Sequence, residues 1–178
     1  LLANALATGA GLTTLIYLFE PLSGAHFNPA VSLLIMLKKE IKFLGFIYYT
    51  AAQITGAIVG VILANLMFDL PAIEISEKIR AGNNIYLSEI IATFGLLLTI
   101  SIISIKNSTI IAPAVGLYIT AGYWFTSSTS FANPAVSIAR SFTNTFTGIC
   151  PSNVIYFIIM QTTAVIIVFF TGKVLLKD

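Results

Sequence analysis

The sequence predicts an all-α membrane protein in which transmembrane helices are combined with two short re-entrant half-helices. Hydrophobic residues make up 57% of the chain and charged residues only 9%, a composition outside the range of ordinary soluble domains. Several uncharged segments are long enough to cross a bilayer. In addition, the run Asn-Pro-Ala-Val-Ser occurs twice, each time in an apolar segment too short to cross.

Five segments are predicted to span the membrane. Four of them contain no charged residue and, at about 1.5 Å per residue, can cross about 30 Å of hydrocarbon; they are residues 1–19, 43–68, 108–131 and 154–172. The fifth, residues 85–105, carries one charge, Glu89. A carboxylate at mid-bilayer costs about 2.5–3.5 kcal/mol on insertion scales, so we expect Glu89 to face protein.

Two shorter apolar segments follow Asn28 and Asn133 and begin with Pro29 and Pro134. Non-helical backbone at membrane depth is tolerated only where it is buried in protein or lines a water-filled cavity. The two segments are therefore predicted to re-enter the membrane and to line a pore.

The distribution of basic residues favours one orientation. If the first span runs from outside to inside, six cations lie inside and three lie outside, which fits the positive-inside rule. The inner ones are Lys38, Lys39, Lys42, Lys106, Lys173 and Lys177, and the outer ones are Lys78, Arg80 and Arg140. The first span lacks the basic start and cleavage site of a signal peptide, and the chain does not begin with Met, so we expect an N-terminal segment to be missing.

The repeated run belongs to a longer internal match. Residues 24–33 match residues 129–138 at an offset of 105. Three full spans lie between the copies, so the second copy enters the membrane from the opposite side, as in an inverted repeat. We predict one domain over residues 1–178, with a first repeat over about 1–68 and a second over about 85–178.

The residue types of the motif indicate how it works. Asn can cap a half-helix, Pro is tolerated in its first turn, and a small Ala lets two such ends meet closely. Positive dipole ends then oppose cations at the midplane, while each Asn amide can donate to a passing oxygen. The predicted pore residues are Asn28, Pro29, Ala30, Asn133, Pro134 and Ala135.

Several other functions are disfavoured. The chain has nine basic and seven acidic residues, so its net charge is too small to indicate nucleic-acid binding. Cys150 is the only cysteine and His26 the only histidine, and the carboxylates are scattered, so we expect no metal site, no cofactor and no catalytic group. A secondary transporter is the alternative, since such proteins also use inverted repeats and broken helices, but Glu89 is the only ionisable candidate for ion coupling.

On these motifs the chain resembles the aquaporin and glycerol-facilitator superfamily, over essentially its whole length. Residues 23–31 are similar to the family's first signature, Glu89-x-x-x-Thr93 to its glutamate motif, and Gln53 and Gln161 to glutamines that follow each half-helix. The resemblance implies passive channels for small neutral solutes in the lipid bilayer, assembled as homotetramers. The match starts at the family's second helix, so the first helix, with the partner of Glu89, is expected to be missing.

The sequence departs from the family at the narrowest part of the pore. Most members carry an arginine directly after the second Asn-Pro-Ala, where this chain has Val136. By family spacing the other filter positions are Thr8, Ala121 and Ser130, although loop lengths could shift Ala121 to Gly122. These side chains are small or apolar, so we expect a filter wide enough for solutes larger than water.

Val136 and residues 124–132 resemble a bacterial branch of the family that is associated with arsenic resistance. This resemblance implies that the protein lies in the cell (inner) membrane and that arsenous acid is one of its solutes. His26 is expected in the pore wall or as a loop-bracing donor, with a pH gate as the alternative. Arg140 either overhangs the outer mouth or lies on the outer surface, where it snorkels or pairs with a carboxylate. Residues 123–125, Tyr-Trp-Phe, are expected at the membrane interface.

Overall fold

The computed structural model describes residues 1–175, without the side chains of residues 106, 108 and 173–175. Helices are the only regular secondary structure in the described part. Its elements in chain order are α1 (Leu2–Ser23), α2 (Pro29–Leu37), α3 (Phe43–Met67), α4 (Asn83–Lys106), η1 (Ser108–Ile110), α5 (Ile111–Phe125), α6 (Pro134–Ala139), η2 (Arg140–Phe142) and α7 (Pro151–Leu175). Of the cations assigned to the inner side, Lys177 and the side chains of Lys106 and Lys173 lie outside the described residues.

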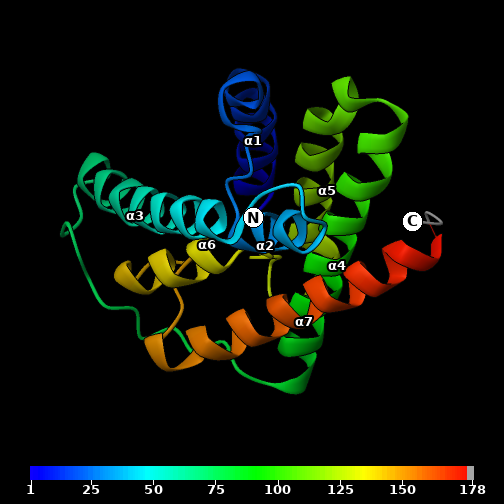
Figure 1. The fold of residues 1–178 in the computed structure, drawn as a ribbon. Helices are drawn as coiled ribbons and strands as arrows, with labels where there is room; N and C mark the ends of the chain where they lie inside the picture. Colours follow the sequence, from blue (N-terminus) through cyan, green and yellow to red (C-terminus); the bar gives the residue numbers. More distant parts are fainter. Residues whose placement is uncertain (176–178) are drawn as a thin grey trace.

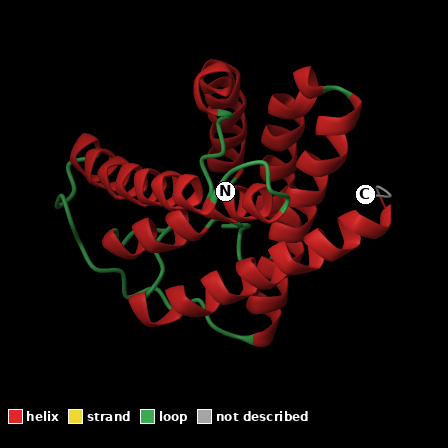
Figure 2. Cartoon of the chain, viewed as in Figure 1, coloured by secondary structure: helices red, strands yellow, loops and turns green. Residues whose placement is uncertain are grey.

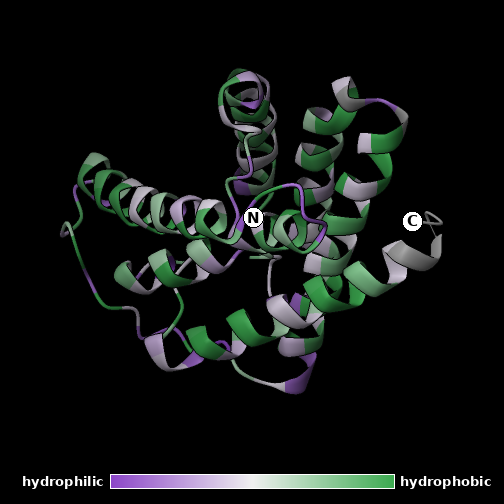
Figure 3. Cartoon of the chain, viewed as in Figure 1, coloured by the Kyte–Doolittle hydropathy of each residue, from purple (hydrophilic) through white to green (hydrophobic). Residues whose placement is uncertain are grey.

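Four helices are long and apolar enough to cross a membrane. They are Leu2–Ser23, Phe43–Met67, Asn83–Ile105 and Pro151–Gly172. Figure 3 shows hydrophobic residues along these helices and hydrophilic residues concentrated at helix ends and connections. The prediction of a multi-pass, all-α membrane protein is thus confirmed.

One predicted span is shorter than expected. The apolar pattern predicts a helix over residues 108–131, but α5 ends at Phe125 and Thr126 is already extended. Residues 126–133 instead form a loop, because the N–H groups of Phe131 and Ala132 bond to the carboxylate of Glu89 rather than to a preceding turn. Apolar composition alone could not reveal this competing acceptor.

The two short helices α2 and α6 meet in the interior. Figure 1 shows them near the centre, among the long helices, with α2 and α6 pointing away from one another. α2 packs against α3, α4 and α7, and α6 packs against α3 and α7. The re-entrant segments thus lie among the long helices rather than outside them.

A long loop connects α3 to α4 and runs along the outer edge of the molecule at the lower left of Figure 2. The loop is bonded to the segment after α6: the Glu74 N–H donates to the Phe142 carbonyl at 3.1 Å and the Ser76 N–H to the Ser141 carbonyl at 2.9 Å. Farther along, the Cys150 N–H donates to the Lys78 carbonyl at 2.7 Å. These backbone bonds attach the loop to the segment between α6 and α7.

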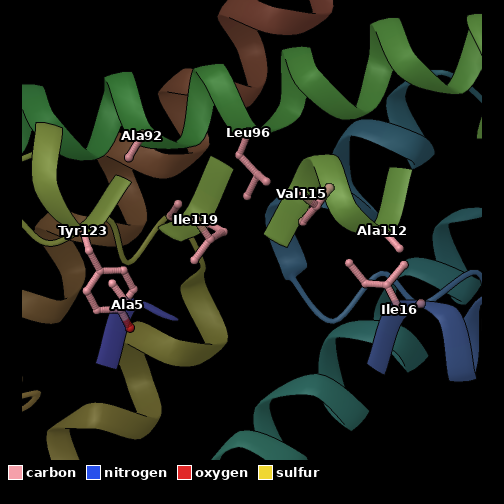
Figure 4. Close-up of a cluster of buried hydrophobic side chains, with 10 residues drawn as sticks. Ala5, Ile16, Ala92, Leu96, Ala112, Val115, Ile119 and Tyr123 are labelled. Carbon is pink, nitrogen blue, oxygen red and sulfur yellow. The ribbon is translucent and has the colours of Figure 1, made fainter. Parts of the chain in front are cut away.

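A core cluster joins α1, α4 and α5 (Figure 4). α1 and α5 cross where Gly9 faces Gly116: a Cβ built on Gly9 would lie 2.7 Å from the Gly116 carbonyl oxygen, and one on Gly116 would lie 2.6 Å from that of Gly9. Only glycine permits this backbone approach, so the crossing sets the distance between two helices that line the site described below.

We predict that Gly9→Ala destabilises the protein, because the new methyl group forces α1 and α5 apart; over-packing of this kind costs about 1–3 kcal/mol. Gly11→Ala is the matched control, since Gly11 lies in the same helix and a Cβ added there would meet no atom within 4 Å. Thermal denaturation in detergent is the measurement. Equal midpoints for the two variants would show that the crossing tolerates a side chain.

Candidate functional site: a pore between two half-helices

The two half-helices begin in the same way. The Asn28 side chain caps α2 by accepting from the Ala30 N–H at 2.9 Å, and the Asn133 side chain caps α6 by accepting from the Ala135 N–H at 3.0 Å and the Val136 N–H at 3.3 Å. Pro29 and Pro134 occupy the first helical position, where the missing N–H is not needed.

The loops before the half-helices also share a backbone conformation. In the first loop φ is 70° at Gly24, 47° at Ala25 and 47° at Phe27; in the second it is 64° at Thr129, 52° at Ser130 and 47° at Ala132. Each of these residues in the first loop lies 105 positions before its counterpart in the second loop, which is the offset of the sequence match. Left-handed backbone is uncommon outside glycine, so its recurrence in register shows that the two copies fold alike.

Each asparagine also bonds to the opposite loop. Asn28 Nδ2 donates to the Ala132 carbonyl at 2.7 Å, and Asn133 Nδ2 donates to the Phe27 carbonyl at 2.9 Å. One amide oxygen thus caps its own helix while the amide nitrogen holds the other repeat. Each NH₂ group retains a second hydrogen that a solute oxygen can accept.

A cavity of about 310 Å³ runs past this junction. Its walls come from faces with a spacing of four residues, because residues four apart lie on one side of a helix. On α1 the lining residues are Thr8, Leu12, Ile16 and Glu20, and on α5 they are Ile111, Val115, Ile119 and Tyr123. Both Asn28 and Asn133 line the cavity, with Arg140 also in its wall toward one end and Lys38 toward the other.

A buried network supports the second loop. Glu89 Oε1 accepts from the Phe131 N–H and Oε2 from the Ala132 N–H, both at 3.0 Å, and Gln161 Nε2 donates to Oε2 at 2.7 Å. Gln161 Nε2 also donates to Ser137 Oγ at 3.0 Å. Glu89 and Gln161 are wholly inaccessible, so the carboxylate holds the loop from behind and is not among the cavity-lining residues.

His26 is part of the first loop. Its Nδ1 is 3.0 Å from Ser32 Oγ, and its ring stacks on Tyr49 with centroids 4.4 Å apart. Gln53 Nε2 donates to the same Ser32 hydroxyl at 2.9 Å. His26 also lines the cavity, so both its predicted roles, in the wall and in bracing the loop, are compatible with its position.

The four predicted filter residues do not all lie together. Thr8 and Ser130 line the cavity, whereas Ala121 is exposed. Val136 is half-buried and packs against the cluster of Phe131, Ile149 and Phe157. The four-residue filter stays a prediction.

The aromatic run at the end of α5 divides between two environments. Tyr123, predicted at the membrane interface, is only 5% exposed, and its hydroxyl lies 3.1 Å from Thr8 Oγ1. Trp124 and Phe125 are exposed, as an interfacial anchor requires. The four-residue spacing from Ile111 to Tyr123 is the signal that could have placed this tyrosine on the cavity wall.

We predict that Glu89→Gln lowers stability, because the amide NH₂ cannot accept from one of the two loop N–H groups. A hydrogen bond to a charged group is worth about 1.5–3 kcal/mol. Thermal denaturation in detergent measures the loss, with Glu77→Gln as a control at an exposed carboxylate in the long loop. A Glu89→Gln variant that melts with the parent would contradict this supporting role.

Comparison with known proteins agrees with this geometry. The family model described as Major intrinsic protein matches residues 1–121. The chain is 53% identical over 162 residues to the aquaglyceroporin AqpS of Rhizobium meliloti (strain 1021), covering 90% of this chain and 69% of the relative. It is 32% identical over 152 residues to aquaporin-5 of Mus musculus and 29% identical over 147 residues to aquaporin-4 of Bos taurus.

The matches to these two mammalian aquaporins cover 80% and 77% of this chain but only 56% and 45% of the relatives. The chain therefore spans about half the length of those relatives. The extent of the family match and the identity to AqpS are nevertheless sufficient to assign the family. This chain belongs to the major intrinsic protein family of aquaporins and aquaglyceroporins, which are membrane channels for water and small solutes such as glycerol and not enzymes.

Proposed function

We propose that this chain forms a passive pore for water and for small uncharged solutes that carry hydroxyl groups, of about the size of glycerol. The observation that carries the proposal is the exchange of hydrogen bonds between the two half-helix ends in the cavity wall. It leaves two amide donors beside a largely apolar path. A solute with oxygen acceptors can bond to these two amides at the junction.

The same junction opposes cations. The N-termini of α2 and α6 meet there, and the aligned peptide dipoles give each a partial positive charge. The Glu89 carboxylate behind the second loop is directed to the loop N–H groups and Gln161. Among the described residues, no acidic side chain bonds to either asparagine amide, which supports a pore for neutral solutes rather than an ion-coupled transporter.

Solute size is the finer part of the proposal. Thr8 and Ser130, both small, line the path, and the relative at 53% identity is named an aquaglyceroporin. Arsenous acid is a neutral trihydroxide at pH 7 and comparable in size to a small polyol, so it belongs to the same class of candidate solutes. Solute flux that needs no ion gradient is the expected behaviour.

The assembly and membrane are also part of the proposal. By family resemblance we infer a homotetramer with one pore per subunit in the cell (inner) membrane, with Lys38, Lys39 and Lys42 on the inner side. The two sequence repeats, over about 1–68 and 85–178, then supply one half-helix each, Pro29–Leu37 and Pro134–Ala139. The recurrence of backbone conformation in the two loops supports this division.

Stopped-flow light scattering on proteoliposomes tests the function. Vesicles that contain the protein are expected to pass water, glycerol and arsenous acid faster than empty vesicles, with no dependence on a proton or sodium gradient. Water flux without glycerol or arsenous acid flux would restrict the pore to water. A gradient requirement would contradict the passive pore.

We predict that Thr8→Phe reduces glycerol flux far more than water flux, because the ring fills the cavity beside Tyr123 while a water molecule still fits past it. Thr14→Phe is the matched control: Thr14 lies on the same helix, is exposed and does not line the cavity. Flux of each solute is measured at equal protein density. Equal losses of glycerol and water flux in Thr8→Phe would show that position 8 does not discriminate by size.

A further inference from the structure

Arg140 lies in the cavity wall although it is four residues beyond the predicted filter position. It begins η2, directly after α6, and its side chain is half-buried among the lining residues. Its Nη2 donates to Tyr123 Oη at 3.4 Å, and Tyr123 Oη is 3.1 Å from Thr8 Oγ1. A connected polar group thus runs from η2 through α5 to α1, on three sides of the path.

The guanidinium of Arg140 is held by an aromatic ring. Its central carbon lies 4.3 Å from the centroid of Phe131, within the range of a cation–π interaction. Phe131 is itself fixed, since it is 4% exposed and its N–H bonds to Glu89. The surface alternatives, snorkelling or pairing with a loop carboxylate, do not describe this position.

A second arginine, Arg80 of the long loop, lies over the same ring at 4.8 Å. It donates to the carbonyls of Gly148 at 2.8 Å, Phe146 at 3.1 Å and Ser128 at 3.3 Å. Burial, with repulsion from Arg140, lowers the pKa of Arg80 to about 10, although Glu89 acts in the opposite direction. Within the described residues neither guanidinium bonds to a carboxylate.

One hydroxyl beside these arginines has no protein partner. Ser130 is 4% exposed and lines the cavity, and its Oγ makes no hydrogen bond to the described part of the protein. Gly122 lies against it, because a Cβ at Gly122 would be 2.7 Å from that oxygen. This oxygen is almost wholly inaccessible, so Ser130 contributes a small side chain to the wall and not a group that a solute reaches.

We propose that Arg140, with Tyr123, Thr8 and Ser130, forms the selectivity constriction of this pore, in place of the side chain at position 136. The inference rests on the proposed channel function. Arg140 supplies donors to a solute oxygen and a positive charge against cations, Tyr123 and Thr8 narrow the path, and Ser130 contributes a small side chain to the wall. Val136 packs against the cluster of Phe131, Ile149 and Phe157 and is not among the cavity-lining residues.

Arg140→Gln tests this assignment, since it removes the charge but keeps a polar side chain. The variant is expected to raise the ratio of glycerol to water permeability, because the guanidinium no longer narrows the path. It is also expected to raise proton leak by about tenfold or more, since a unit charge a few Å from the path is worth at least about 1.4 kcal/mol at an effective dielectric constant near 20. Proton leak is followed with a pH-sensitive dye inside the vesicles.

Three further variants separate the roles. Arg140→Lys is expected to keep the proton barrier and change the permeability ratio, and Tyr123→Phe to change the ratio alone. Lys42→Gln removes a cation at the exposed start of α3, outside the cavity lining, and is expected to match the parent.

Val136→Ala provides the opposing test. If Val136→Ala shifts the permeability ratio and Arg140→Gln leaves the ratio and the proton leak unchanged, the assignment is overturned and position 136 sets the filter. A parent that passes water but not glycerol contradicts the proposed solute range, while the proton leak of Arg140→Gln still tests the constriction. A parent without any flux overturns both proposals.

Discussion

The rest of the structure depends on the hydrogen bonds that Asn28 and Asn133 each donate to the loop of the opposite repeat. Backbone that stops in mid-membrane leaves polar groups that lipid cannot satisfy. Here each amide caps its own half-helix and binds the carbonyl of the opposite loop, at 2.7 Å from Asn28 and 2.9 Å from Asn133. The two half-helix ends are thereby joined, and both asparagines line the cavity. The same bonds therefore hold the fold together and leave the chemistry that the pore uses.

The loops before the two half-helices are held in place by different side chains. Ser32 and Ser137, and Gln53 and Gln161, take similar places, since each glutamine donates to the serine of its half-helix. Glu89 then anchors the second loop through two backbone N–H groups. Among the described residues no carboxylate does this for the first loop, where His26 bonds to Ser32 and stacks on Tyr49 instead. The second loop is therefore the more firmly fixed, and it is the loop that carries Phe131, under both arginines.

The sequence was sufficient to predict the features that depend on local chemistry. Asn-Pro at a helix start implies a cap and a first-turn proline whatever the surroundings, and both half-helices begin in that way. The filter depends on which way a helix is turned, which its neighbours decide. Ala121 and Tyr123 are only two residues apart, yet at 3.6 residues per turn they are separated by about 200° around the helix. Counting along the chain therefore selects Ala121, which is exposed, whereas the packing of α1 against α5 turns Tyr123 to the cavity.

Residue 136 alone could not predict the residues around Arg140. Their arrangement depends on the close crossing of Gly9 and Gly116 and on the long loop between α3 and α4. The crossing brings α1 near enough to α5 for Thr8 to approach the Tyr123 hydroxyl. The loop brings Arg80 onto Phe131 from more than 50 residues earlier in the chain, and Arg140 meets the same ring from η2. A charge absent from its usual place after Asn-Pro-Ala can thus be supplied one helical turn later, provided that an aromatic ring and a hydroxyl are positioned to hold it. In the constriction proposed above, selectivity depends on a packed group of residues from four segments and not on the side chain at position 136 alone.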